Sequence, residues 1–399
     1  MYILDCDKKF NKELPIPDFY SRFSSISKSN KLNIIIIKEQ FDDASFRYRG
    51  YNIIQTMKNN SKYNVNCFLV SELNELYNIA NKLELVIIQK ALWSFELESF
   101  VNFLKDKSIK VLYDVDDLIY DTKYVPNYLN SIGDNSEKTI QHFFSHSQRY
   151  QLICEMCDGY IVSSKKIQDR IIKDYDKPAW VFHSYLNLEQ ESVSKDIVNL
   201  KKNTYLNDKF IIGFFSGSNS HERDLEVAEQ ALLKLINKYD DVYLKIVGNM
   251  NLHSEFKKLK DDGRILISKQ VPYEELQYEM GKVDLNIVPL QKNEFNDCKS
   301  ELEYFEASIV NTLTLATDNV VYQKCIEDGV DGFLTDELSW FEKMEHIYLN
   351  HYKLRAVAEN ARTKCLREYG SHQQEIPLER MYDNIFEELK VMNDLNSVN

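Results

Sequence analysis

The feature that most constrains this chain is a regular alternation of short apolar runs with longer segments of helical period. The runs are four to six residues long and carry apolar side chains on both faces. Strands of this kind occur in parallel sheets whose faces are covered by crossover helices. We therefore predict an α/β chain with strands at Leu32–Ile37, Val65–Val70, Leu85–Gln89, Lys110–Val115, Tyr160–Ser163, Trp180–His183, Phe210–Phe215, Val242–Val247, Ile265–Ser268, Leu285–Pro289 and Leu313–Thr317.

The predicted strands fall into two series, separated by a polar stretch, Asn187–Asp208, that we interpret as a linker. A length of 399 residues also suggests two or three domains. We predict two doubly wound, Rossmann-like domains that face a central cleft. The first spans residues 1–190, of which residues 1–30 form an N-terminal extension, and the second spans residues 191–372. Residues 373–399 contain an amphipathic helix pattern.

Charge argues against a nucleic acid as the main partner. The chain has 49 basic and 62 acidic side chains, which gives a net charge of −13. The acidity lies in the second half. Residues 201–399 hold 24 basic and 35 acidic residues, whereas residues 1–200 hold 25 basic and 27 acidic residues. The organising feature of the surface is therefore not a basic patch.

The sequence contains no run of the roughly 18 to 20 apolar residues that a membrane helix requires, and its start does not resemble a secretory signal. Seven scattered cysteines fit reduced thiols better than a disulfide framework, and the CxxC at Cys154 and Cys157 has no partner pair for a metal. We expect a cytoplasmic protein. Peripheral contact with the inner face of the membrane and a homo-oligomer are both compatible with the sequence.

A glycine turn follows one predicted strand of the second series, at the edge where ligands bind in open α/β sheets. The turn contains Gly217, Ser218 and His221, and Arg223 lies in the first turn of the helix that follows. Backbone N–H groups at such a helix N-terminus can bind an anion. An ordinary capped turn explains the same residues equally well.

A second polar cluster follows the strand that ends at Pro289. If a helix begins near Cys298, Lys299, Glu303 and Glu306 lie on one of its faces. A lysine at a helix N-terminus opposes the usual dipole preference and suits a bound phosphate, and Glu306 could accept hydrogen bonds from vicinal hydroxyls. The alternative is a solvated face with a Lys299–Glu303 ion pair.

Two further clusters follow strands of the first series. Asp114, Asp116 and Asp117 gather carboxylates at one strand end, where a cation or sugar hydroxyls would relieve their repulsion. We favour no metal here, because phosphate-binding elements already occur in the other domain. Arg47 and Arg49 follow the first strand in a predicted loop that could meet an anionic group.

Together, the clusters resemble the bacterial family 4 glycosyltransferases of the GT-B fold, in a subgroup with SRYR, YDVDDLI, GSxTHxxD and FNxxKSELKxxE motifs. Here the motifs read FRYR from Phe46, YDVDDLI from Tyr113, GSNSHERD from Gly217 and FNDCKSELEYFE from Phe295. Their order and spacing cover residues 33 to 385. The resemblance implies an N-terminal acceptor domain, a C-terminal donor domain and a last helix, residues 373–399, that crosses back to the first domain.

The resemblance further implies a retaining, metal-independent enzyme of surface polysaccharide or glycoprotein biosynthesis. It would use no cofactor, only a UDP-, GDP- or TDP-linked sugar, and a glycan, lipid-linked or protein acceptor. Glu306 would bind the ribose and Lys299 the departing diphosphate. The implied site comprises catalytic Lys299, His221 and Asp117, donor-binding Gly217, Ser218, Arg223, Ser300 and Glu306, and acceptor-side Arg47, Arg49 and Asp116.

Three departures from the family pattern leave alternatives open. Cys298 stands where the family has the first glutamate of a pair, Glu303 replaces a usual lysine, and residues 311–313 replace a Gly-x-Pro turn. A catalytically silent glycosyltransferase-like subunit that binds a partner enzyme or an acceptor protein is the first alternative. An epimerase-like GT-B enzyme acting without an acceptor is the second.

Overall fold

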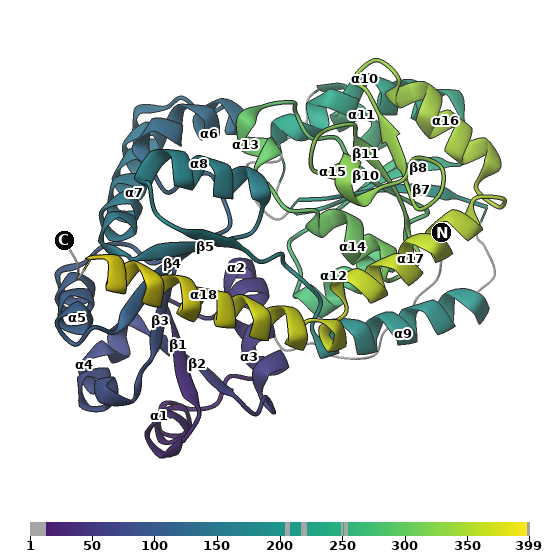
Figure 1. Cartoon of the computed structure of the whole chain (residues 1–399). Helices are drawn as coiled ribbons and strands as arrows, with labels where there is room; N and C mark the ends of the chain where they lie inside the picture. Colours follow the sequence, from purple (N-terminus) through teal and green to yellow (C-terminus); the bar gives the residue numbers. More distant parts are fainter. Residues whose placement is uncertain (1–12, 204–207, 217–221, 249, 251–253, 397–399) are drawn as a thin grey trace.

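The computed structural model describes residues 13–203, 208–216, 222–248, 250 and 254–396. Its first half contains a six-stranded parallel sheet of order β2-β1-β3-β4-β5-β6 (Figure 1). The strands occur where the apolar runs predict them, because side chains on both faces are buried. Their bounds are β1 (Leu32–Lys38), β2 (Tyr63–Leu69), β3 (Leu85–Gln89), β4 (Lys110–Val115), β5 (Gly159–Val162) and β6 (Ala179–Val181).

The second half contains another six-stranded parallel sheet, of order β12-β11-β10-β7-β8-β9. The predicted fold of two parallel sheets with flanking helices is thereby confirmed. The edge strand β12 was not predicted, because its three residues are too few to show a pattern. The bounds are β7 (Phe210–Phe215), β8 (Val242–Val247), β9 (Ile265–Ser268), β10 (Leu285–Val288), β11 (Leu313–Thr317) and β12 (Phe333–Thr335).

Helices cover both sheets, and most connect one parallel strand to the next. No helix among the described residues is long and apolar enough to cross a membrane. In the first half they are α1 (Phe19–Lys28), α2 (Ala44–Phe46), the π-helical turn η1 (Arg47–Tyr51), α3 (Asn52–Met57), η2 (Val70–Glu72), α4 (Leu73–Leu76), η3 (Tyr77–Lys82), α5 (Phe95–Asp106), η4 (Thr122–Tyr124), α6 (Val125–Ile132), α7 (Glu137–Met156) and α8 (Lys165–Tyr175).

The second half has its own set, which begins with the helix that joins the two sheets. They are α9 (Leu188–Asn203), α10 (Glu222–Lys238), α11 (Ser254–Asp261), α12 (Tyr273–Gly281), α13 (Glu294–Asp297), α14 (Leu302–Ser308), α15 (Tyr322–Cys325), α16 (Trp340–Asn350), α17 (Arg355–Tyr369), η6 (Ser371–Gln373) and α18 (Glu375–Asn396).

Part of the segment expected to be an N-terminal extension forms α1. α1 packs on β2 and buries Ile26 completely in the core of the first half. Arg22 donates to the carbonyl oxygen of Cys67 at 2.6 Å and pairs with the carboxylate of Glu72 at 2.7 Å. Residues 19–28 therefore belong to the first sheet's layer of helices.

The predicted linker is helical rather than irregular over most of its length. α9 packs against α12, and its Ile197 is fully buried. Near its end, the ammonium group of Lys201 donates to the carbonyl oxygens of Val310 and Asn311 at 2.9 and 3.0 Å. These carbonyls follow the C-terminal end of α14, so a cation there also suits the helix dipole. The connection between the two sheets is thus tied to the second half.

The final helix, α18, lies against the first sheet (Figure 1). The ring of Phe386 stacks on that of Tyr63 in β2, with centroids 6.0 Å apart, and Tyr63 also donates to the carboxylate of Asp383. Leu378 and Ile385 are fully buried in a core shared by both halves. The chain therefore returns to its first half after completing the second.

Candidate active site

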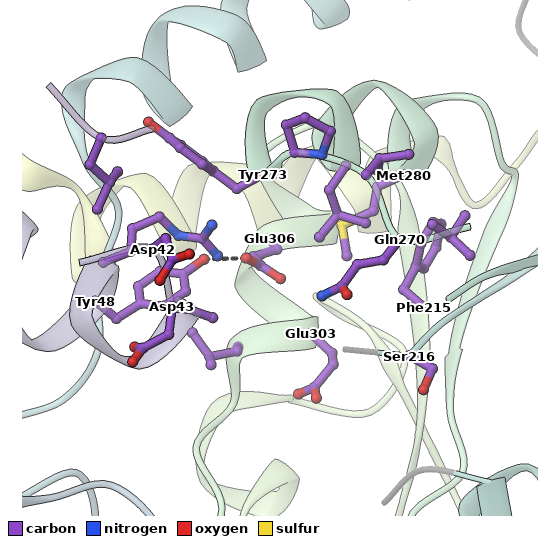
Figure 2. Close-up of a pocket in the computed structure, with 18 residues that line it drawn as sticks. Asp42, Asp43, Tyr48, Phe215, Ser216, Gln270, Tyr273, Met280, Glu303 and Glu306 are labelled. Carbon is purple, nitrogen blue, oxygen red and sulfur yellow. Dashed lines mark hydrogen bonds between the residues drawn. The ribbon is translucent and has the colours of Figure 1, made fainter. Parts of the chain in front are cut away.

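A cavity of about 450 Å³ lies between the two halves, at the edge where the parallel strands end. One wall comes from the segment after β1, and the other from the ends of β7 and β8, the loop before α12 and one face of α14 (Figure 2). We call this the first cavity. Its polar or aromatic lining residues are Asp42, Asp43, Arg47, Tyr48, Phe215, Ser216, Gln270, Tyr273, Glu303 and Glu306.

Glu306 places a carboxylate in this cavity from the middle of α14. It is 8% exposed and accepts a hydrogen bond from the hydroxyl of Tyr48 (Figure 2). Burial raises the pKa of Glu306, although the charge of Arg47 and the bond from Tyr48 oppose that rise. A carboxylate in such a site can accept hydrogen bonds from vicinal hydroxyls, as the sequence predicts for Glu306.

Arg47 lies in the same cavity, on the opposite wall from Glu306. Its guanidinium group is held between two aromatic rings, 4.8 Å from the centroid of Tyr48 and 4.4 Å from that of Tyr273. Its Nε atom is buried and has no hydrogen-bond partner among the described residues. The structure thus places Arg47, which the sequence assigns to the acceptor side, in the same cavity as Glu306.

Arg49 differs from its neighbour, because its side chain is only 1% exposed. Its guanidinium group donates to both carboxylate oxygens of Asp114, at 3.0 and 2.7 Å, and to the carbonyl oxygen of Phe182. The expected loop is the π-helical turn η1, which points Arg49 into the first sheet. The structure therefore gives Arg49 a packing role, and an anionic substrate has no access to it.

The two remaining carboxylates of the cluster after β4 share one cation. Lys90 lies 3.1 Å from Asp116 and 2.8 Å from Asp117. Burial would raise the pKa of Asp116, but the charge of Lys90 and a hydrogen bond from Ser45 outweigh it and lower the value to about 2. Lys90 thus relieves the repulsion for which the sequence suggested a cation.

The predicted helix from Cys298 is wrong, since α13 ends at Asp297 and α14 begins only at Leu302. The residues between them form a turn, so Lys299 does not stack with Glu303 and Glu306. Lys299 instead lines another cavity, of about 920 Å³, and its ammonium group lies 3.7 Å from the buried carboxylate of Asp224. We call this the second cavity.

The turn exists because Cys298 is drawn into the first half of the molecule. Cys298 and Phe295 belong to the apolar core around the first sheet, and the ring of Phe295 meets that of Tyr128 edge-on at 5.0 Å. The hydroxyl of Ser164 donates to the Cys298 carbonyl at 3.1 Å. Burial raises the pKa of the Cys298 thiol to about 12, so it stays protonated. Cys298 therefore joins the two halves and faces neither cavity as a polar ligand.

Two other predicted donor residues, Arg223 and Ser300, do not line the first cavity. Arg223 donates to the carbonyl oxygen of Asn130 in α6 at 2.8 Å and so bridges the two halves. Ser300 is half-buried in the turn before α14. Gly217, Ser218 and His221 lie outside the described residues. Of the predicted site, the structure brings Arg47 and Glu306 together in the first cavity, while Lys299 lines the second.

The sequence reasoning missed two tyrosines that complete the first cavity. Tyr48 stands between the arginines of the FRYR motif, and Tyr273 follows Pro272 after β9. The signal for Tyr48 was its place within a motif that we recognised for its arginines. For Tyr273 the sequence offered no signal except Pro272, which follows a predicted strand.

Comparisons with solved structures identify the fold. Sucrose-phosphate synthase from Thermosynechococcus elongatus matches with a TM-score of 0.62 at 13% identity, over 89% of this chain and 99% of its own. HepE from Anabaena, in complex with UDP, matches with a TM-score of 0.58 at 13% identity, over 89% of this chain and 100% of its own. The chain has the GT-B fold.

A third GT-B structure, a glycosyltransferase from Rickettsia africae, matches with a TM-score of 0.60 at 14% identity, over 90% of this chain and 99% of its own. A scan against protein-family models and a search of curated proteins found no match. The likeness therefore rests on three-dimensional structure, and it extends over nearly the full length of each GT-B protein.

Proposed function

We propose that this protein is a retaining, metal-independent glycosyltransferase of surface polysaccharide or glycoprotein biosynthesis. It transfers a sugar from a UDP-, GDP- or TDP-linked donor to a glycan, lipid-linked or protein acceptor. The observation that carries the proposal is the buried Glu306 carboxylate in a cavity between the two halves of a GT-B fold. Retention and independence of metal follow from the family that the four sequence motifs resemble.

The first cavity suits the nucleoside part of the donor. Its volume of about 450 Å³ falls in the usual range for small-molecule sites. A nucleoside offers hydroxyl and N–H donors, and the cavity offers them the carboxylates of Glu303 and Glu306. The diphosphate would leave past Ser216, at the end of β7, towards Lys299 and the N-terminal end of α14, where positive potential stabilises the leaving group.

The second cavity suits the acceptor. It is about twice as large as the first, at about 920 Å³, and the turn that carries Lys299 and Glu301 forms part of its wall. Among the described residues, five cations and three carboxylates, those of Asp297, Glu301 and Glu368, line this cavity together with aromatic rings. The excess of cations suits an acceptor with phosphate or carboxylate groups. The cations are Lys165, Lys166, Lys299, Lys324 and Arg380.

Replacing Glu306 and Lys299 tests the proposed donor site. We expect Glu306→Ala to weaken nucleotide binding, because the ribose hydroxyls lose their acceptor. We expect Lys299→Ala to lower the transfer rate by about 10²- to 10³-fold, since a preorganised positive group is removed from the leaving diphosphate. Calorimetry with UDP, GDP and TDP measures the first effect, and transfer from the corresponding UDP-, GDP- and TDP-sugars the second.

The matched control is Lys343→Ala, a half-buried lysine paired with Asp328 away from both cavities. This variant should bind and transfer as the wild type does. Full activity of both Glu306→Ala and Lys299→Ala would contradict the assignment. The anomeric configuration of the product, read by nuclear magnetic resonance, tests retention.

A silent glycosyltransferase-like subunit remains the second candidate, and the position of Cys298 favours it. Where the family has a donor-binding glutamate, this chain buries a thiol in the core of its first half. If the wild type binds none of the three nucleoside diphosphates, the silent subunit is the better conclusion. The epimerase-like alternative predicts an isomerised sugar when donor is supplied without acceptor.

A further inference from the structure

We propose that Tyr48 is a positioning residue of the donor site, which orients Glu306 for the ribose and ties that carboxylate to the start of α9, the connection between the two halves that we call the hinge. The proposal rests on the function proposed above. Glu306 belongs to the second half, whereas Tyr48 belongs to η1 in the first, 258 residues earlier in the chain. A donor pocket that needs Tyr48 is complete only when the halves lie together.

The contacts of Tyr48 fix its hydroxyl group on both sides. The hydroxyl donates to one oxygen of Glu306, and it accepts a hydrogen bond of 2.9 Å from the side-chain amide of Gln190. The ring is 3% exposed and meets Phe305, a neighbour of Glu306 in α14, edge-on at 6.1 Å. Among the described residues, Tyr48 bonds one Glu306 oxygen, and we assign the other oxygen to a ribose hydroxyl.

Gln190 connects this bond to the hinge. It lies in the first turn of α9, the helix that joins the two sheets, and it is fully buried. Gln190 and Asn187 exchange hydrogen bonds of 3.1 and 2.8 Å, and the Asn187 amide donates to Asn52 in α3 at 3.2 Å. The polar chain thus runs from the first half, through the hinge, to the Glu306 carboxylate.

Charge explains why the tyrosine hydroxyl matters. The groups that face Glu306 are Arg47 and Tyr48 from η1 and Glu303 from its own helix. Burial raises the pKa of Glu306, the charge of Arg47 and the Tyr48 bond lower it, and Glu303 raises it again. Burial and the charge of Glu306 raise the pKa of Tyr48 well above its usual value, so its hydroxyl keeps the proton that it donates. Removing the hydroxyl would leave Glu306 easier to protonate.

The test compares Tyr48→Phe with Tyr51→Phe. Both tyrosines lie in η1 and are buried, and Tyr51 also donates to a carboxylate, that of Glu189 in α9, at 2.8 Å. Tyr51 does not line the first cavity, so it is a matched control. By calorimetry with UDP, GDP and TDP, we expect Tyr48→Phe to weaken binding about tenfold and Tyr51→Phe to leave it unchanged.

The pH profile separates positioning from a general loss of structure. Nucleotide affinity should fall at low pH as Glu306 becomes protonated, and in Tyr48→Phe this fall should move to higher pH. It should not move in Tyr51→Phe. In a Glu306→Gln background, which has no carboxylate to titrate, Tyr48→Phe should cause less than a twofold further loss.

Each outcome decides a different point. If the wild type binds a nucleotide but both tyrosine variants bind it alike with the same pH profile, the role of Tyr48 is overturned and the donor site stands. If the wild type binds none of the three nucleotides, both the donor site and the role of Tyr48 are overturned. Thermal unfolding of each variant shows whether the fold is intact.

Discussion

At the scale of single residues, the buried cations of this chain are fixed by carbonyl and carboxylate oxygens. Arg49 is paired with Asp114 inside the first half, and Lys201 caps the carbonyls that follow α14. Burial lowers the pKa of Lys201 to about 7, although the charge of Asp284 opposes this. Lys201 is therefore a buried group whose titration reports on the link between α9 and the second half.

This shift predicts a pH-dependent stability. In the unfolded chain Lys201 keeps its proton up to about pH 10.4, whereas in the folded chain it releases the proton above about pH 7. Because the unfolded state binds more protons between these values, Lys201 makes the free energy of unfolding rise with pH there. We expect Lys201→Met to lose this contribution, as measured by urea denaturation at pH 7 and pH 9.

The control for this experiment is Lys195→Met, the same change at an exposed position of α9. Its difference in unfolding free energy from the wild type should be the same at both pH values. Equal pH dependence in the wild type and Lys201→Met would show that the Lys201 ammonium group stays charged in the folded protein.

At the scale of elements, the amphipathic pattern of α18 predicts one buried face without saying where that face packs. In the structure it packs on Tyr63 of β2 and on α3. Leu378 is fully buried, whereas Ile376, two residues earlier on the same helix, is 64% exposed. Truncating each of the two side chains therefore distinguishes the effect of burial from that of helix propensity.

This contrast predicts different costs for the same kind of truncation. We expect Leu378→Ala to lower the free energy of unfolding by about 2 to 5 kcal/mol, because it leaves a cavity in the shared core. Ile376→Ala should change it by no more than about 0.5 kcal/mol. Chemical denaturation measures both, and similar losses in the two variants would mean that α18 is not docked in solution as it is here.

At the scale of the whole molecule, contacts through α13 hold the two halves together. Phe295 is inserted in the core around the first sheet, and Glu294 pairs with Arg170 and accepts a bond of 2.8 Å from Asn127. The bond from Arg223 to α6 lies nearby. These contacts join protein side chains to each other, so we expect them to hold this side of the cleft together whether or not a nucleotide is bound.

Small-angle scattering can test this closure. We expect the radius of gyration to be the same with and without a bound nucleotide, because the contacts of α13 with the first half are made by protein side chains. Phe295→Ala should enlarge the ligand-free molecule, because the apolar contact that holds α13 is lost. A wild-type protein that contracts when it binds the nucleotide would contradict a closed ligand-free state.

Contacts between the two halves mark the limit of what the sequence could predict. The sheets were predictable because runs such as Leu32–Ile37 are apolar on both faces, a local pattern. The Tyr48–Glu306 bond and the burial of Cys298 were not, because each depends on how one half meets the other. The helix predicted from Cys298 failed for that reason, since docking of Phe295 and Cys298 in the first half breaks it. The boundaries at residues 190 and 372 stay predictions.

The return of α18 to β2 also constrains how the chain is made. The rings of Tyr382 and Phe386 in α18 cover part of the face of the first half around Tyr63. During synthesis, α18 must therefore leave the ribosome before it can cover this surface. Part of the first half would stay exposed until α18 is made, whereas the second half can fill its own core before that.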